Sequence, residues 1–192
     1  MVSVKRSAML VAGVVMTTMG SFAAAAGVYV GVQAGHQNAS VGLYDEVDVS
    51  VSGSTGGVLA GVRTGIGQNS YLALEVNASV SMADGASGSG SKIEMDNSYG
   101  ASLILGHHLT PNTSVYGRAG YQLAEATFHS GDQEWDASFT GMRYGVGIET
   151  ALTRQASLRL DWSHTDYGSR RAGGIEVDPD ENLVQLGVVY RF

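Results

Sequence analysis

The feature that most constrains this sequence is a regular alternation of apolar and polar residues with a period of two. In residues 28–35 (VYVGVQAG), one phase reads Val, Val, Val, Ala and the other reads Tyr, Gly, Gln, Gly. This period is typical of β-strands, because successive side chains of a strand point to opposite faces. Similar segments recur near residues 57–63, 71–80, 98–106, 115–123, 142–149, 158–163 and 184–192. The sequence therefore predicts eight strands of about ten residues each.

The connections between the predicted strands alternate strictly between short and long. Three are short and contain turn-forming residues: 65–70, 108–113 and 151–156. Four are long and polar: 36–55, 81–92, 127–137 and 165–181. Within them, the glycine- and serine-rich stretch 81–91 is typical of a mobile loop tip. In an up-and-down arrangement of strands, this alternation places all four long loops at one end.

The first 26 residues have the three parts of a secretory signal peptide. Lys5 and Arg6 precede an uncharged stretch at 8–19, and small residues follow as far as Ala26. Because polar residues interrupt the stretch, cleavage near Ala26 is favoured over a retained anchor, leaving 27–192 as one domain. No later segment approaches the roughly 20 apolar residues of a transmembrane helix. A mature chain that spans a membrane must therefore do so with strands.

Composition excludes several classes of protein. The chain has no cysteine, so disulfides, thiolate metal sites, cysteine nucleophiles and lipid-modified cysteines are excluded. Its formal net charge is −7, and removal of the first 26 residues would make it 9 − 18 = −9. Lys92 is then the only lysine, whereas phosphate binding needs clustered lysine and arginine. A nucleic-acid partner is therefore not expected.

Alternation alone does not show which face of the strands is buried. A soluble barrel packs its apolar phase inside, whereas a transmembrane barrel turns that phase toward lipid. The polar phase here consists mostly of Gly, Ser and Gln with isolated charges, and a water-facing sheet usually has more Lys, Glu and Thr. Small residues around a few opposite charges fit a narrow lumen, where each buried charge needs a partner. We therefore predict a luminal charge network of Arg63, Glu75, Arg118, Arg143, Glu149, Arg159 and Asp161, with Arg191 in the same phase.

The expected fold is an all-β, eight-stranded, antiparallel up-and-down transmembrane β-barrel. Aromatic residues in the apolar phase fit lipid contact, although a soluble core would also hold them there. Export, an even number of strands and long loops at one end favour the membrane. The barrel must close, because an open strand edge in hydrocarbon would leave backbone groups unpaired.

The last seven residues, LGVVYRF at 186–192, contain the pattern Gly-x-x-Tyr-Arg-Phe. Further motifs are 99–103 (YGASL), 109–112 (LTPN), 115–121 (VYGRAGY) and 144–149 (YGVGIE). With these motifs the chain resembles the small eight-stranded outer-membrane barrels of Gram-negative bacteria, the OmpA/OmpX-like and opacity-like porin group. The resemblance covers the mature chain apart from its loops. One departure is Ile104, an apolar residue on the predicted luminal face, which weakens the case for an open hydrophilic pore.

This resemblance implies a location in the bacterial outer membrane, in contact with its lipids and lipopolysaccharide. It also implies that the outer-membrane assembly machinery recognises the terminal signal Val188, Tyr190 and Phe192. The family performs envelope, attachment or immune-interaction roles, so a host or surface ligand would bind through the loops.

Candidate catalytic groups are few. None of the five histidines is followed two positions later by serine, as in the barrel lipid A deacylases, and none has metal-ligand spacing. Glu75, Glu149 and Asp161 offer acid–base chemistry, but charges in a narrow barrel must be paired whatever the function. The acidic loop runs lack the ordered spacing of a calcium loop. The sequence therefore predicts no catalytic residues, no metal and no cofactor.

The leading hypothesis is a non-enzymatic outer-membrane barrel whose four surface loops act in envelope integrity or adhesion. Two alternatives stay open. One is a narrow porin-like channel for small solutes, and the other is a lipid-modifying envelope hydrolase.

Overall fold

The computed structural model describes residues 27–43, 47–82, 84–86, 92–130, 133–168, 170–172 and 175–192. The predicted signal peptide, 1–26, lies outside the described residues, as do residues 83 and 87–91 of the predicted loop tip at 81–91; its residues 81–82 and 84–86 belong to strands. Among the residues described, no helix is long and apolar enough to cross a membrane.

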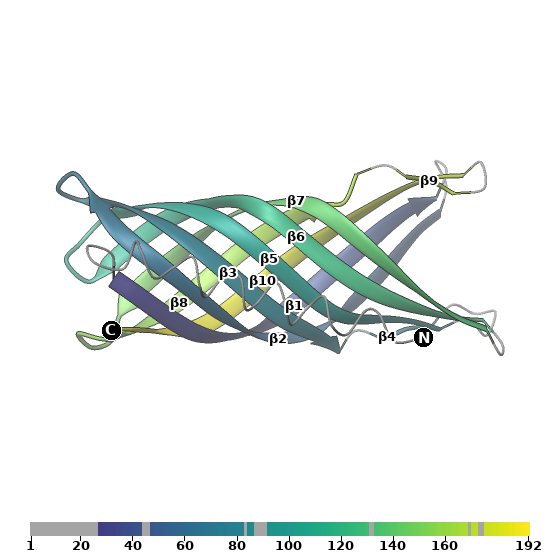
Figure 1. Ribbon diagram of the computed structural model, residues 1–192, viewed down its shortest axis with the longest axis horizontal. Coiled ribbons are helices and arrows are strands. Elements are labelled where there is room, and N and C mark those ends of the chain that lie inside the picture. The colour runs from purple at the N-terminus through teal and green to yellow at the C-terminus, as the bar shows by residue number, and fades with distance from the viewer. Residues whose placement is uncertain are drawn as a thin grey trace.

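Eight long antiparallel strands close into a barrel (Figure 1). They are β1 (Gly27–Leu43), β2 (Val47–Ile66), β3 (Ser70–Met82), β5 (Lys92–His108), β6 (Thr113–Ser130), β7 (Gln133–Ala151), β8 (Ala156–Asp166) and β10 (Ile175–Arg191). Each pairs with its neighbour along the chain, and β10 pairs with β1 to complete the ring. Two three-residue strands, β4 (Asp84–Ala86) and β9 (Arg170–Ala172), add to β5 and β10. The predicted eight-stranded barrel is confirmed.

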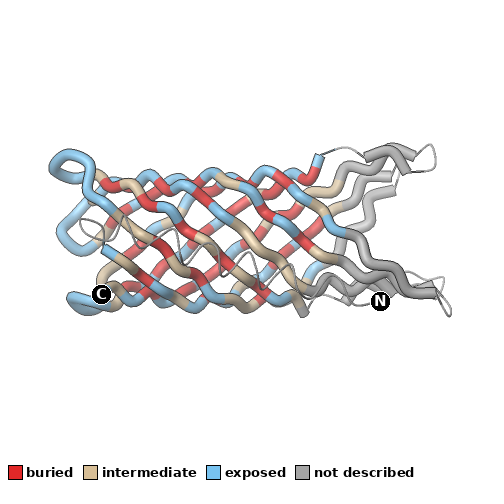
Figure 2. The backbone as a smooth tube through the Cα atoms, viewed as in Figure 1, coloured by how far each residue is buried: buried red, intermediate tan, exposed pale blue. Residues whose placement is uncertain are grey.

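Burial alternates residue by residue along the strands (Figure 2). In β8, Ser157, Arg159 and Asp161 are at most 3% exposed. Their neighbours in the other phase are 38–48% exposed, namely Leu158, Leu160 and Trp162. The apolar phase thus faces outward and the polar phase fills the interior, which is the arrangement of a barrel in lipid and the inverse of a soluble barrel.

The three predicted short connections are confirmed as tight turns. They occupy 67–69, 109–112 and 152–155. Gly67 has a φ of 72°, a left-handed conformation that glycine adopts without a Cβ clash. In the other two turns, the hydroxyls of Thr110 and Thr153 accept backbone N–H bonds from Thr113 and Ala156. These turns lie beside the C-terminus, and we call this the turn end of the barrel and the opposite one the hairpin end (Figure 1).

The prediction of long loops is wrong, because most residues of the predicted loops belong to strands. The predicted strand length of about ten residues is wrong as well. The strands contain 11–20 residues, apart from the short β4 and β9. Strand β1 stays paired with β2 as far as Leu43 and Val47, and β6 with β7 as far as Ser130 and Gln133. The reason is that the outer face of a hairpin meets water beyond the membrane, so the apolar residues of that face end. Backbone pairing continues there, and the apolar residues shift to the other phase, as at 39–43 and 47–51, which interrupts the pattern of a strand in lipid.

Candidate functional site

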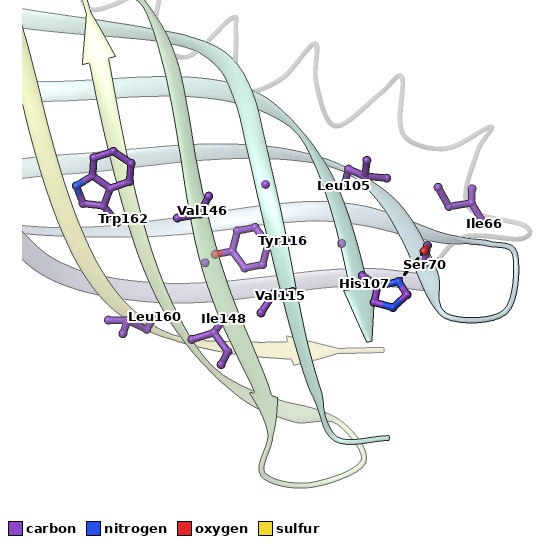
Figure 3. A pocket seen from close by; sticks show the side chains of 13 residues that line it. Ile66, Ser70, Leu105, His107, Val115, Tyr116, Val146, Ile148, Leu160 and Trp162 are labelled. Atoms are coloured by element: carbon purple, nitrogen blue, oxygen red, sulfur yellow. Dashed lines mark hydrogen bonds between the residues drawn. The ribbon is translucent and has the colours of Figure 1, made fainter. Parts of the chain in front are cut away.

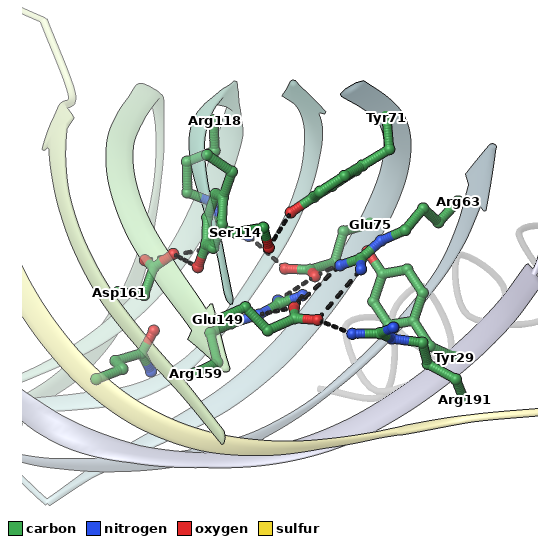
Figure 4. Close-up of polar contacts among 12 residues, drawn as sticks. Tyr29, Arg63, Tyr71, Glu75, Ser114, Arg118, Glu149, Arg159, Asp161 and Arg191 are labelled. Atoms are coloured by element: carbon green, nitrogen blue, oxygen red, sulfur yellow. Dashed lines mark hydrogen bonds and ion pairs between the residues drawn. The ribbon is translucent and has the colours of Figure 1, made fainter. Parts of the chain in front are cut away.

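The barrel interior holds a continuous network of ion pairs that contains six of the seven predicted luminal charges (Figure 4). Each of the six side chains points inward because it belongs to the phase of its strand that alternates with the lipid-facing residues. The six are Arg63 on β2, Glu75 on β3, Arg118 on β6, Glu149 on β7, and Arg159 and Asp161 on β8.

Glu149 forms the part of the network nearest the turn end. Both of its oxygens accept from Arg63, with Nη1–Oε1 and Nη2–Oε2 distances of 3.2 and 3.0 Å. Arg159 donates to Oε2 from Nη2 at 2.9 Å, and Arg191 donates to Oε1. Three guanidinium groups thus converge on one carboxylate, and Arg191, whose side chain is 33% exposed, is the most accessible of them.

Glu75 and Asp161 extend the network toward the middle of the barrel. Glu75 accepts from Arg159 at 2.5 Å, from Arg118 and from the hydroxyl of Tyr29 at 3.0 Å. Asp161 accepts from Arg118 at 3.1 Å and from the hydroxyl of Tyr116 at 2.5 Å. Every carboxylate of the network therefore accepts from at least one arginine.

Two of the ion pairs cross the barrel. The pair Arg63–Glu149 joins β2 to β7, and the pair Arg159–Glu75 joins β8 to β3. In the ring of eight long strands, the two members of each pair lie four strands apart, on opposite walls. The side chains that meet in these pairs therefore occupy the lumen at this level.

Arg143, the seventh predicted member, lies outside the ion-pair network. It is 2% exposed, and its guanidinium donates to Ser163 at 2.7 and 3.0 Å, to Gln122 at 3.0 Å and to Gln185 at 3.3 Å. Within the described part of the chain it forms no ion pair with a carboxylate. The lumen thus has two layers, one ionic near the turn end and one of amides and hydroxyls around Arg143.

Three tyrosines belong to the site although the sequence did not predict them as members. Tyr29, Tyr71 and Tyr116 are buried, and each lies directly opposite a glycine of the next strand. A Cβ at Gly61, Gly106 or Gly147 would lie 2.1–2.4 Å from the facing ring, so each ring occupies the space that a side chain would need. The guanidinium of Arg63 stacks on the ring of Tyr71 at 4.0 Å, a cation–π contact. Only the strand register reveals these Tyr–Gly pairs, and register is not visible in the alternation.

The interior also contains an apolar cluster, as the position of Ile104 predicts. Ile104 is 1% exposed and packs with the three luminal tyrosines and with Leu59, Ala73 and Val189. At the hairpin end, Tyr167 donates to Glu181 at 3.0 Å. Among the described residues, no group of three or more His, Asp or Glu side chains is arranged to hold a metal ion.

The residues of the predicted assembly signal lie on the outer face at the turn end. Val188, Tyr190 and Phe192 are 41–77% exposed, and the rings of Tyr190 and Phe192 meet edge to face at 5.2 Å. This exposure fits an apolar surface in contact with lipid.

Comparison with known proteins identifies relatives of this barrel. Residues 8–192 match the "Outer membrane protein beta-barrel domain". The 31 kDa outer-membrane immunogenic protein of Brucella melitensis biotype 1 is 28% identical over 166 residues, covering 76% of this chain and 69% of the relative. The 22 kDa outer membrane protein of Rhizobium leguminosarum bv. viciae is 27% identical over 92 residues, covering 46% and 43%.

Solved structures that share the fold include two bacterial proteins. Neisserial surface protein A (NspA) has a TM-score of 0.60 at 20% identity, covering 85% of this chain and 97% of that protein. Ail of Yersinia pestis, in complex with the heparin analogue sucrose octasulfate, has a TM-score of 0.56 at 15% identity, covering 86% and 99%. With the domain match over almost the whole length, the chain belongs to the outer membrane protein β-barrel family and is a protein of the bacterial outer membrane.

Proposed function

We propose that this protein is a non-enzymatic barrel that anchors four acidic hairpins at the cell surface, where they serve adhesion or envelope integrity. The observation that carries the proposal is the pair of ion pairs across the lumen, which place side chains where a channel would need a passage. The hairpins then remain as the part of the molecule that meets other molecules.

The strands are longer than a membrane requires. A transmembrane strand needs about 9–11 residues, whereas β1 has 17 and β2 has 20. On the outer face of β1 the apolar residues end at Ala34, and His36 and Asn38 follow. At a rise of about 3.3 Å per residue, the excess of β1 continues for roughly 20 Å along the strand beyond the apolar band. Outer-membrane barrels carry their short turns in the periplasm, so these hairpins project outward from the cell.

The hairpins are strongly acidic. Fifteen of the 18 acidic residues fall in the segments 41–52, 82–97, 125–137 and 166–181, together with only Lys92, Arg170 and Arg171 as basic residues. The other three acidic residues are the carboxylates of the luminal network. This separation supports a partner that is cationic, or one reached through divalent cations, at the surface of an anionic membrane.

The protein is therefore expected not to bind sulfated polyanions. Ail was solved with a heparin analogue, but here the acidic hairpins would repel such a ligand. We expect the barrel in detergent to pass through immobilised heparin at physiological salt and to be retained by immobilised polylysine. Retention on heparin that high salt reverses would contradict the proposed partner chemistry.

The ion pairs that cross the lumen also argue against the channel alternative. We expect purified barrels in planar bilayers to give no steady conductance, because the Arg63–Glu149 and Arg159–Glu75 pairs cross the lumen. The same preparation must show a gel band that shifts on boiling, which demonstrates that folded barrels were inserted. Reproducible single-channel steps from such a preparation would favour a narrow pore and refute the proposal.

The hydrolase alternative has less support. Glu75, Glu149 and Asp161 are each engaged by arginine and are at most 3% exposed, so none is open to a substrate as a general base. We further propose that residues 1–26 direct export with cleavage near Ala26, and that the assembly machinery recognises Val188, Tyr190 and Phe192. The basic and apolar pattern of the first segment and the exposed apolar end of β10 support these two assignments.

A further inference from the structure

The lipid-facing wall of the barrel contains an apolar groove near the turn end (Figure 3). It has a volume of about 740 Å³, within the usual range of ligand pockets. The groove runs over the outer faces of β5 to β8 and reaches the adjoining ends of β2 and β3, and its length is bordered by Leu105, Val146, Ile148 and Trp162.

The groove exists because one position in a row of large apolar side chains is a glycine. Strand register aligns Leu105 on β5, Gly117 on β6, Val146 on β7 and Trp162 on β8 across the wall. A Cβ at Gly117 would meet no atom closer than 4.0 Å, so the space above this glycine is open. The floor of the groove is thus β6 itself, and its walls are the side chains of the neighbouring strands.

The end of the groove nearest the turns carries two polar side chains beside the apolar Ile66. His107 and Ser70 line it there, and the Nδ1 atom of His107 lies 3.1 Å from the hydroxyl of Ser70. Both side chains project from the outer face at the last residue pair between β3 and β5. An apolar trough that ends in hydrogen-bonding groups at the level of the turns matches an amphiphile, with its chain in the membrane and its headgroup at the interface.

We propose that this groove binds one acyl chain of a membrane phospholipid, whose headgroup lies against His107 and Ser70. The groove is continuous with the lipid-facing wall, so its occupant comes from the surrounding hydrocarbon. A bound acyl chain fills this concavity, which the mobile chains of bulk lipid would pack poorly, and it makes the van der Waals contacts that would otherwise be lost. The turn end faces the periplasm, so the lipid belongs to the periplasmic leaflet.

The experiment uses the mature barrel in phosphatidylglycerol nanodiscs that contain a trace of phosphatidylethanolamine with a diazirine on its acyl chain. After illumination, mass spectrometry measures the lipid attached to peptides from β6 and β7 and to peptides from the outer faces of β1 and β10. We expect labelling at β6 and β7 to exceed that at β1 and β10 by about threefold or more. The substitution Gly117→Leu, which fills the groove, should abolish this excess.

Gly56→Leu is the matched control. Gly56 also faces lipid from a strand, β2, and a Cβ there would meet no atom closer than 4.0 Å, but it lies outside the groove. This variant should keep the excess labelling at β6 and β7. Equal labelling around the parent barrel would overturn the proposal and leave ordinary bulk lipid. Cross-links between two barrels through β6, lost in Gly117→Leu, would overturn it in favour of an interface between copies of the chain.

Discussion

The substitution Glu75→Gln is expected to lower the free energy of unfolding of the barrel by about 3–5 kcal/mol, the cost of removing one partner from a buried ion pair. Glutamine preserves the shape of the side chain, so the loss arises from charge rather than from a cavity. Glu75 is 1% exposed and accepts from Arg118 and Arg159. After the substitution, two buried guanidinium groups lose one of the three carboxylates that balance them.

Reversible urea unfolding in lipid vesicles, followed by tryptophan fluorescence, measures this loss. Glu125→Gln is the control, because Glu125 lies near the hairpin end and outside the ion-pair network. The double variant Glu75→Gln with Arg118→Gln should be more stable than the sum of the two single effects predicts, because it removes opposite charges together. A Glu75→Gln barrel as stable as the Glu125→Gln barrel would show that the network does not hold the walls together.

The sequence was sufficient to predict the ring of strands and the side chains that face its interior, because both follow from the two-residue alternation of apolar and polar residues. Arg118, Glu149 and Asp161 could be placed in the lumen without coordinates, since a residue's phase decides its face. The pairing of the charges could not be predicted. Arg143 belongs to the same phase as the other arginines, yet it lies in a layer where Gln122, Gln185 and Ser163 are its neighbours.

Strand length and register were beyond the sequence for a different reason. An apolar outer phase records contact with lipid, so it ends where the hairpins leave the membrane and the apolar residues shift to the other phase. The outer parts of β1 and β2 therefore read as a loop, although their backbones stay paired as far as Leu43 and Val47. The register of the strands is fixed when the ring closes, which depends on residues far apart in the sequence. The position of Tyr71 opposite Gly106 follows from this register and could not be predicted without it.

The substitution Gly106→Val tests whether these Tyr–Gly pairs stabilise the barrel. Local propensity favours valine over glycine in a strand. We nevertheless expect the variant to lose about 1–3 kcal/mol of unfolding free energy, because overpacking forces the surrounding side chains to move. A Cβ at this position would lie 2.1 Å from the ring of Tyr71, and that ring also supports the guanidinium of Arg63. Displacing the ring therefore disturbs the ionic layer as well.

Gly117→Val provides the matched comparison, since Gly117 lies on the adjacent strand and faces outward with space for a side chain. Urea unfolding should show this variant to be as stable as the parent or more stable, because it gains strand propensity without a clash. In a Tyr71→Ala background, Gly106→Val should cost less than it does with the ring present, and the difference measures the coupling between the two positions. If the cost is the same in both backgrounds, the ring of Tyr71 is not what requires glycine at 106.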